Sequence, residues 1–183
     1  VRPTHYSLSL RVVPSDERYE GTIAIDLALD RPRHVIWLHG DAHEVSEVVA
    51  EQAGRQLPGR YEQVDAGGVV KVTLPEALAA GAAKLTLRFS TPFSLRNNGI
   101  YKVESGGDAY VMTQMEPVWT RRAFPCFNEP AFKVPWDGSL TVRKAQRAVA
   151  NTRELERTDA GDGMTTIRFA TTEPLPSYLI ALA

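Results

Sequence analysis

The sequence predicts an all-β fold of the β-sandwich or saddle-like type, with little helix. Apolar and polar residues alternate along several short stretches, which is the pattern of strands buried on one face. Turn-forming residues separate these stretches, and such regular spacing of short strands is typical of sandwiches and related folds. The only stretch that could form a helix is the turn near Pro75–Ala80, which Gly81 would stop.

The first two predicted strands have the clearest alternation. Residues 5–12, HYSLSLRV, place their aromatic and aliphatic side chains on one face, with serine and arginine opposite. Residues 19–30, YEGTIAIDLALD, repeat the pattern. Pro14, Ser15 and Asp16 lie between them and suit a hairpin loop. Six more strands are predicted at residues 34–40, 69–75, 83–90, 138–145, 164–171 and 177–183, and the first of these, HVIWLHG, has the continuous apolar run of a more buried strand.

Composition excludes several classes of function. The chain has 183 residues, enough for one domain with a sizeable core, and a formal net charge of -1. There is no basic stripe interleaved with aromatic residues, so nucleic acid is not expected as a partner. No apolar run is long enough for a transmembrane helix. The first residues begin a strand and not a signal peptide, and the missing initiator Met suggests that an upstream segment was removed. A single cysteine cannot form an internal disulfide; this favours a cytoplasmic, reducing compartment, although an exported protein without disulfides would show the same count.

Two candidate sites fail on their residue patterns. His39 and His43 in HGDAH have the spacing of a zinc-binding pair, but the glutamate of zinc peptidases is absent and Gly40 disfavours the helix that would align both rings. We interpret them as a strand end and a polar loop. Cys126 has no identifiable base partner, so we interpret it as a buried structural cysteine.

The unusual stretch TQMEPVWTRRAFPCFNEP occupies residues 113–130. Its prolines, Pro117, Pro125 and Pro130, lack N–H donors and prevent pairing as a central strand. We therefore expect an extended loop packed on a sheet edge. Four aromatic residues would anchor this loop: Trp119, Phe124, Phe127 and Phe132.

Two polar residues of this stretch, Gln114 and Glu116, are candidates for binding. They are two positions apart, so an extended backbone points both to one side and Met115 to the other. An amide oxygen and a carboxylate together can accept hydrogen bonds from an ammonium group. The alternative, on residue types alone, is that Glu116 pairs with Arg121 or Arg122.

The stretch TQMEPVWTRRAFPCFNEPAFKVPW resembles the signature of the N-terminal domain of M1-family zinc aminopeptidases, the group that includes the aminopeptidase N and puromycin-sensitive aminopeptidase types. The opening strand RPTHYSLSLRV, the segment NNGIYKV and the last segment PLPSYLIALA are similar to the family more loosely. Asn128 departs from the usual aspartate, which puts a structural ion pair in doubt. Trp119 stands where the family often has an acidic residue, and a large aromatic side chain there could narrow the cleft that binds the substrate.

The resemblance implies a β domain, residues 1–183, that covers the active-site cleft of a following thermolysin-like catalytic domain. Gln114 and Glu116 would bind the free α-amino group of peptide substrates, and Arg121, Arg122 and Glu129 would form the framework that holds them. Their face would pack against the catalytic domain, so we expect Met115, Val118 and Trp119 to be exposed here.

Several motifs of the family are missing from these residues. The H-E-x-x-H zinc helix and the G-x-M-E-N segment do not occur, so the resemblance implies no catalytic residue and no metal ligand in this fragment. We expect the fragment alone to be inactive and to bind no zinc, with the zinc held elsewhere in the full-length enzyme. A non-catalytic M1-like scaffold or protein-interaction module is the alternative.

Overall fold

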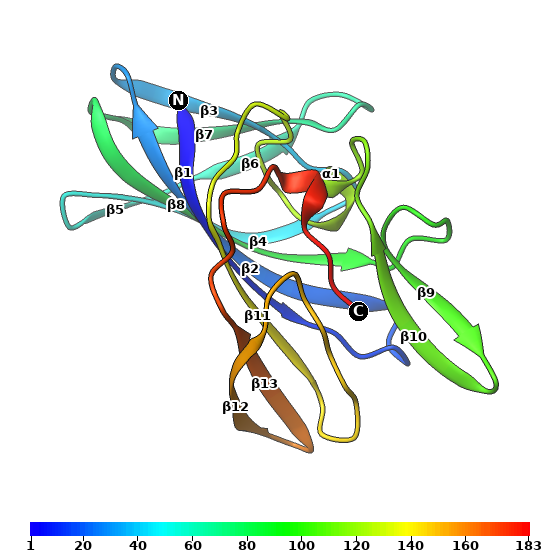
Figure 1. Ribbon diagram of the computed structural model, residues 1–183. Helices are drawn as coiled ribbons and strands as arrows, with labels where there is room; N and C mark the ends of the chain where they lie inside the picture. Colours follow the sequence, from blue (N-terminus) through cyan, green and yellow to red (C-terminus); the bar gives the residue numbers. More distant parts are fainter.

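The computed structural model describes residues 1–183 and contains three sheets (Figure 1). The largest has eight strands in the order β12-β13-β11-β1-β2-β8-β4-β5. Neighbouring strands are antiparallel except for β1 and β11, which run parallel. The bounds of its strands, in chain order, are β1 Arg2–Arg11, β2 Arg18–Leu29, β4 Glu44–Gln52, β5 Arg55–Pro58, β8 Gly81–Pro92, β11 Trp136–Arg143, β12 Glu154–Gly161 and β13 Met164–Phe169.

Two smaller sheets and two helical turns complete the fold. The three-stranded sheet has the order β3-β7-β6, and β9 and β10 form a hairpin that projects at the side of the molecule (Figure 1). No helix has the length and apolar character needed to span a membrane. The bounds are β3 Arg33–His39, β6 Arg60–Gln63, β7 Val69–Leu78, β9 Gly99–Ser105, β10 Asp108–Gln114, the α-helical turn α1 Thr120–Ala123 and the 3-10 turn η1 Ser177–Leu179.

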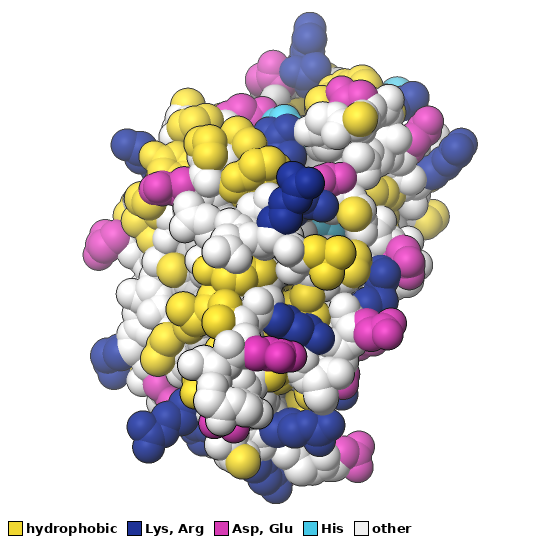
Figure 2. Space-filling view, turned by 90° about the vertical axis from the view of Figure 1, so that its right-hand side faces the viewer, with side chains coloured by type: hydrophobic (Ala, Val, Ile, Leu, Met, Phe, Trp, Pro, Cys, Tyr) yellow, Lys and Arg dark blue, Asp and Glu magenta, His cyan; other side chains and the backbone are white.

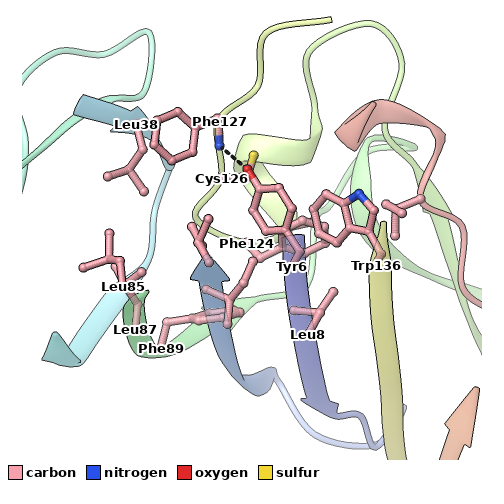
Figure 3. Close-up of a cluster of buried hydrophobic side chains, with 14 of the residues drawn as sticks. Tyr6, Leu8, Leu38, Leu85, Leu87, Phe89, Phe124, Cys126, Phe127 and Trp136 are labelled. Carbon is pink, nitrogen blue, oxygen red and sulfur yellow. Dashed lines mark hydrogen bonds between the residues drawn. The ribbon is translucent and has the colours of Figure 1, made fainter. Parts of the chain in front are cut away.

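The core lies between the large sheet and the three-stranded sheet. A single cluster of 35 buried residues includes inward residues of β1, β2 and β8 together with those of β3 and β7. In Figure 3, Leu38 of β3 lies on one side of this core, with Leu85 and Leu87 of β8 below it. The alternation in β1 and β2 therefore reports burial correctly, and the predicted all-β class is confirmed.

The predicted helical turn near Pro75–Ala80 is wrong. Residues through Leu78 continue β7, and β8 begins at Gly81. The pairing of β3 with β7 shifts its register between Arg33 and Val35, so Pro75 lies in a bulge where its missing N–H breaks no regular ladder.

Two predicted strands also need correction. The stretch 34–40 is not more buried than the others, because β3 is an edge strand with one face outward and Trp37 is 54% exposed. The stretch 177–183 begins with η1 and pairs only through an isolated bridge at Leu182. Pro174 and Pro176 lack N–H donors just before it, which prevents a continuous ladder there.

Candidate functional site

Residues 113–130, called the signature stretch below, begin where the β9–β10 hairpin ends. Gly99 starts β9 with φ of 66°, a left-handed conformation that favours glycine, and a Cβ there would lie 3.2 Å from Cβ of Arg122. After Gln114 the chain turns through a cis Glu116–Pro117 bond into α1, and the Trp119 N–H donates to the Met115 carbonyl at 2.7 Å. The glycine thus lets the hairpin approach α1 closely and start the stretch beside it.

Exposure alternates at the start of this stretch, as the extended backbone predicts. Gln114 and Glu116 are exposed, whereas Met115 is only 2% exposed. The Gln114 amide donates a long hydrogen bond of 3.5 Å to the backbone carbonyl of Glu116. The expected exposure of Met115 is therefore wrong, because it anchors the loop in the core. Val118 is 40% exposed, as expected, and Trp119 is half-buried.

The carboxylate of Glu116 makes no ion pair and no hydrogen bond within the chain. The alternative that it pairs with one of the two arginines is wrong, because both are engaged elsewhere. Arg122 Nε lies 3.2 Å from a carboxylate oxygen of Asp41. Arg121 donates from Nη1 to the carbonyl of Gly67 at 2.5 Å. The carboxylate of Glu116 is therefore an unpaired negative charge exposed to solvent.

Asn128 holds Arg121 from the other end of the stretch. Its side-chain oxygen accepts from the Arg121 backbone N–H at 3.1 Å and from Nε at 3.5 Å. Asn128 is 4% exposed, and its Nδ2 has no hydrogen-bond partner. The framework predicted from Arg121, Arg122 and Glu129 is thus correct for the arginines only; Glu129 is exposed and pairs with neither.

Two tyrosines of the large sheet hold residues 120–128, the buried half of the stretch. Tyr19 of β2 donates its hydroxyl to the carbonyl of Ala123 at 2.7 Å. The Tyr6 hydroxyl of β1 accepts from the Phe127 N–H at 3.0 Å, the bond drawn in Figure 3, while its ring stacks on Trp136 at a centroid distance of 3.8 Å. Burial raises the pKa of both tyrosines, so their hydroxyls stay protonated.

His39 attaches the stretch to the edge of the three-stranded sheet. His39 and Cys126 exchange backbone hydrogen bonds of 2.7 and 2.9 Å, and His39 Nδ1 accepts from the Asn128 N–H at 3.3 Å. The predicted loop on a sheet edge is confirmed. Phe124 and Phe127 are 0% and 4% exposed, so these two aromatic residues anchor it as predicted.

His43 joins the loop after β3 to the start of α1. Its Nε2 lies 2.8 Å from the carbonyl of Arg121 and its Nδ1 lies 2.6 Å from the hydroxyl of Thr91. A carbonyl can only accept, so Nε2 carries the proton and Nδ1 accepts from Thr91. Burial lowers the pKa of His43 to about 4, partly opposed by the bond to Arg121. The ring is therefore neutral near pH 7, and its two hydrogen bonds hold the loop after β3 against Thr91 and α1.

The remaining candidates have structural roles. Cys126 is fully buried, and burial raises the pKa of its thiol, which confirms the prediction of a structural cysteine. His39 ends β3 and His43 lies in the following loop, as predicted from HGDAH. No group of three or more His, Cys, Asp or Glu side chains could hold a metal ion.

Comparison with known protein families identifies the family of this chain. The family model of the Peptidase M1 N-terminal domain matches residues 2–179. The chain belongs to this family. The match covers β1 through η1, and the signature stretch lies inside it. The resemblance seen in the sequence is thereby confirmed as membership of the Peptidase M1 N-terminal domain family.

Relatives of this chain among known proteins are aminopeptidases by name. Puromycin-sensitive aminopeptidase of Caenorhabditis elegans is 27% identical and matches 99% of this chain. Probable M1 family aminopeptidase 1 of Encephalitozoon cuniculi and Aminopeptidase 2 of Candida albicans are each 30% identical, again over 99% of the chain. The chain spans only 20–21% of the length of these three relatives.

Sequence reasoning missed the residues that hold this site in place. Tyr6 and Tyr19 were placed correctly on apolar faces, but their hydroxyl bonds to the signature stretch were not anticipated. A signal was available, because the first inward residue of each of these two predicted strands is a tyrosine and not an aliphatic residue. Buried tyrosine hydroxyls usually find a hydrogen-bond partner. His43 gave no comparable signal, because its partners are a distant threonine and a backbone carbonyl.

Proposed function

We propose that this domain is the N-terminal part of a zinc aminopeptidase, and that Gln114 and Glu116 help to bind the free α-amino group of peptide substrates. The exposed half of the signature stretch, residues 113–119, would form one wall of a cleft whose other walls belong to a following catalytic domain. Peptide-bond hydrolysis itself would take place on that domain.

One observation carries the proposal: the exposed carboxylate of Glu116 is uncommitted although two arginines follow within six residues. A surface ion pair is worth only about 0–1 kcal/mol, so closeness in sequence does not by itself pair Glu116 with an arginine. Here Asp41, Asn128 and the Gly67 carbonyl occupy the arginines instead. The neighbouring amide of Gln114 adds a second acceptor oxygen. This arrangement suits a ligand that brings its own positive charge, such as an α-ammonium group.

The residues of this chain do not fit a zinc ion. A catalytic zinc needs three protein ligands, and no cluster of that size exists here. Both ring nitrogens of His43 are already engaged, and His39 Nδ1 accepts from the Asn128 N–H. The proposal therefore assigns the zinc ligands and the general base to residues outside the chain. We expect the isolated domain to bind no zinc and to hydrolyse no aminoacyl anilide.

The test is the kinetics of Glu116→Gln in the parent enzyme. A charge-assisted hydrogen bond is worth about 1.5–3 kcal/mol, so kcat/KM for free-amine substrates should fall about ten- to a hundredfold. Zinc content by elemental analysis should stay unchanged, because Glu116 is not a ligand. Gln114→Ala should cost less, since its amide is neutral.

Glu129→Gln is the matched control. Glu129 is also an exposed, unpaired carboxylate of the same stretch, but it lies beyond the buried half. Its substitution should leave kcat/KM within about twofold of the wild type, as expected of a surface change. Equal kinetic losses for both variants, or none for Glu116→Gln, would refute the substrate-binding role.

A non-catalytic scaffold is the competing function for the whole protein. The sequence that follows Ala183 in the parent gene distinguishes the scaffold from the enzyme. An H-E-x-x-H motif there supports the enzyme, and its absence there supports the scaffold.

A further inference from the structure

An apolar groove lies beside the C-terminal residues. It has a volume of about 760 Å³ and runs between the β9–β10 hairpin, the end of β11 and residues 145–149. Its lining includes Tyr110, Met112, Val149 and Ala183. Figure 2 views the side of the molecule on which the hairpin projects, where hydrophobic side chains gather in patches broken by charged ones.

The last residues enter this groove already paired on both sides. Val149 and Ala183 exchange backbone hydrogen bonds of 2.7 and 3.1 Å, and Ala150 faces Leu182 in an antiparallel bridge. On the other side, the Thr113 hydroxyl of β10 donates to the Leu182 carbonyl at 3.0 Å, and its oxygen accepts from the Leu182 N–H at 2.9 Å. The chain direction and register at Ala183 are therefore fixed between two segments.

Extending this register by two residues leads along the groove. In an antiparallel pair, the residue directly after Ala183 would face Ala148, and the next would face Arg147. The Arg147 N–H has no hydrogen-bond partner in the structure, and a continued ladder would provide one. Opposite residues share a face, and Ala148 is half-buried against the core while Arg147 is exposed.

The side chains along this path are unusually exposed for apolar residues. Val149 is 61% exposed, Tyr110 is 49% and Met112 is 39%. Contiguous exposed apolar surface in a groove commonly marks an interface.

We propose that the polypeptide directly following Ala183 in the parent protein continues the antiparallel pairing along Ala148 and Arg147 and fills this groove. The inference rests on the proposed function, in which the chain is the first part of a longer protein, and the named relatives are about five times as long. The groove would then be the seam between this domain and the next. Because the first residue after Ala183 would share the inward face of Ala148, it should be apolar.

Hydrogen exchange measures the pairing without any need for activity. We compare the chain ending at Ala183 with the parent protein. The amide of Arg147 should exchange about tenfold or more slowly in the parent, since it would gain a ladder bond there. The Glu129 amide, remote from the groove, serves as the internal reference. Unchanged exchange at Arg147 would overturn the proposal.

Cysteine pairs test the register directly. In the parent, Ala148→Cys combined with cysteine at the position directly after Ala183 should form a disulfide readily, because the two side chains share a face in a closely spaced pair. Arg147→Cys combined with the same position is the mismatched control, and it should cross-link far less. Native Cys126 is fully buried and does not compete. Equal cross-linking of both pairs would contradict the proposed register.

Other outcomes separate the alternatives. Protection of Arg147 that appears in the short chain alone and grows with its concentration would assign the groove to a second copy and overturn the proposal. A parent that lacks H-E-x-x-H would refute the aminopeptidase function, yet both measurements could still be made on it. Failure of one proposal is therefore distinguishable from failure of the other.

Discussion

The two halves of the signature stretch differ in how they are held. Residues 120–128 are anchored from three sides: by Tyr6 and Tyr19 of the large sheet, by His39 at the edge of the three-stranded sheet and by His43 in the loop that follows. Residues 113–119 place Met115 in the core but leave Gln114 and Glu116 in solvent. The buried half therefore fixes the backbone, and the exposed half keeps its polar groups free to bind.

The largest difference between the halves should appear on truncation of their apolar side chains. Phe124→Ala removes a side chain that is 0% exposed, so the free energy of unfolding should fall by about 3–5 kcal/mol. Val118→Ala in the exposed half should change it by no more than about 0.5 kcal/mol. Urea unfolding of both variants measures this, and similar losses would show that the halves are equally well held.

Acid should loosen the buried half through His43. Its pKa is about 4 in the folded chain and 6.5 as its ordinary value, so the unfolded chain takes up the proton more readily. The stability that neutral His43 contributes is full above pH 6.5 and is lost as pH falls toward 4. At about 1.4 kcal/mol per pH unit between the two pKa values, the loss reaches about 3 kcal/mol. Burial and the charge of Arg121 also lower the pKa of His39, which acts in the same direction.

The variant His43→Gln isolates this contribution. It should be less stable than the wild type at pH 7 and should lose less further stability between pH 6.5 and 4. Urea titrations across this range measure both effects. An unchanged pH slope in His43→Gln would mean that other groups cause the acid sensitivity.

Asn128→Asp should strengthen the buried half. Asn128 leaves Nδ2 unpaired in the core, whereas an aspartate would remove that donor and place a negative charge on the carboxyl group that accepts from Arg121. A gain of about 1 kcal/mol, or about 2–4 °C in Tm, is expected at pH 7. Asn128→Ala should lower Tm, because the Arg121 N–H would lose its acceptor. A fall in Tm for the aspartate variant would show that burying the extra charge costs more than the pairing returns.

Glu116→Gln should have the smallest effect on folding. The side chain is exposed and unpaired, so the free energy of unfolding should change by no more than about 0.5 kcal/mol. A clear loss of Tm would indicate a structural partner for Glu116 and would weaken its assignment to substrate binding.

The parts of the fold predicted correctly are those with a strong pattern of their own. β1, β2, β8, β11 and β13 each bury one face, and their apolar residues alternate accordingly. β12 was missed because all eight of its residues are exposed, so no alternation marks it. The hairpin β9–β10 is also largely solvent-exposed, and only its resemblance to a family segment indicated β9.

The sequence by itself determined the fold class, the inward faces of the main strands and the exposed positions of Gln114 and Glu116. These follow from local periodicity and from prolines, which act through the backbone of their own neighbourhood. The tertiary structure decided which segments meet: the parallel pairing of β1 with β11, the burial of Met115, and the partners that draw Arg121 and Arg122 away from Glu116. Periodicity reports which face of a strand is buried but not which strand lies beside it, because those contacts join residues far apart in the chain.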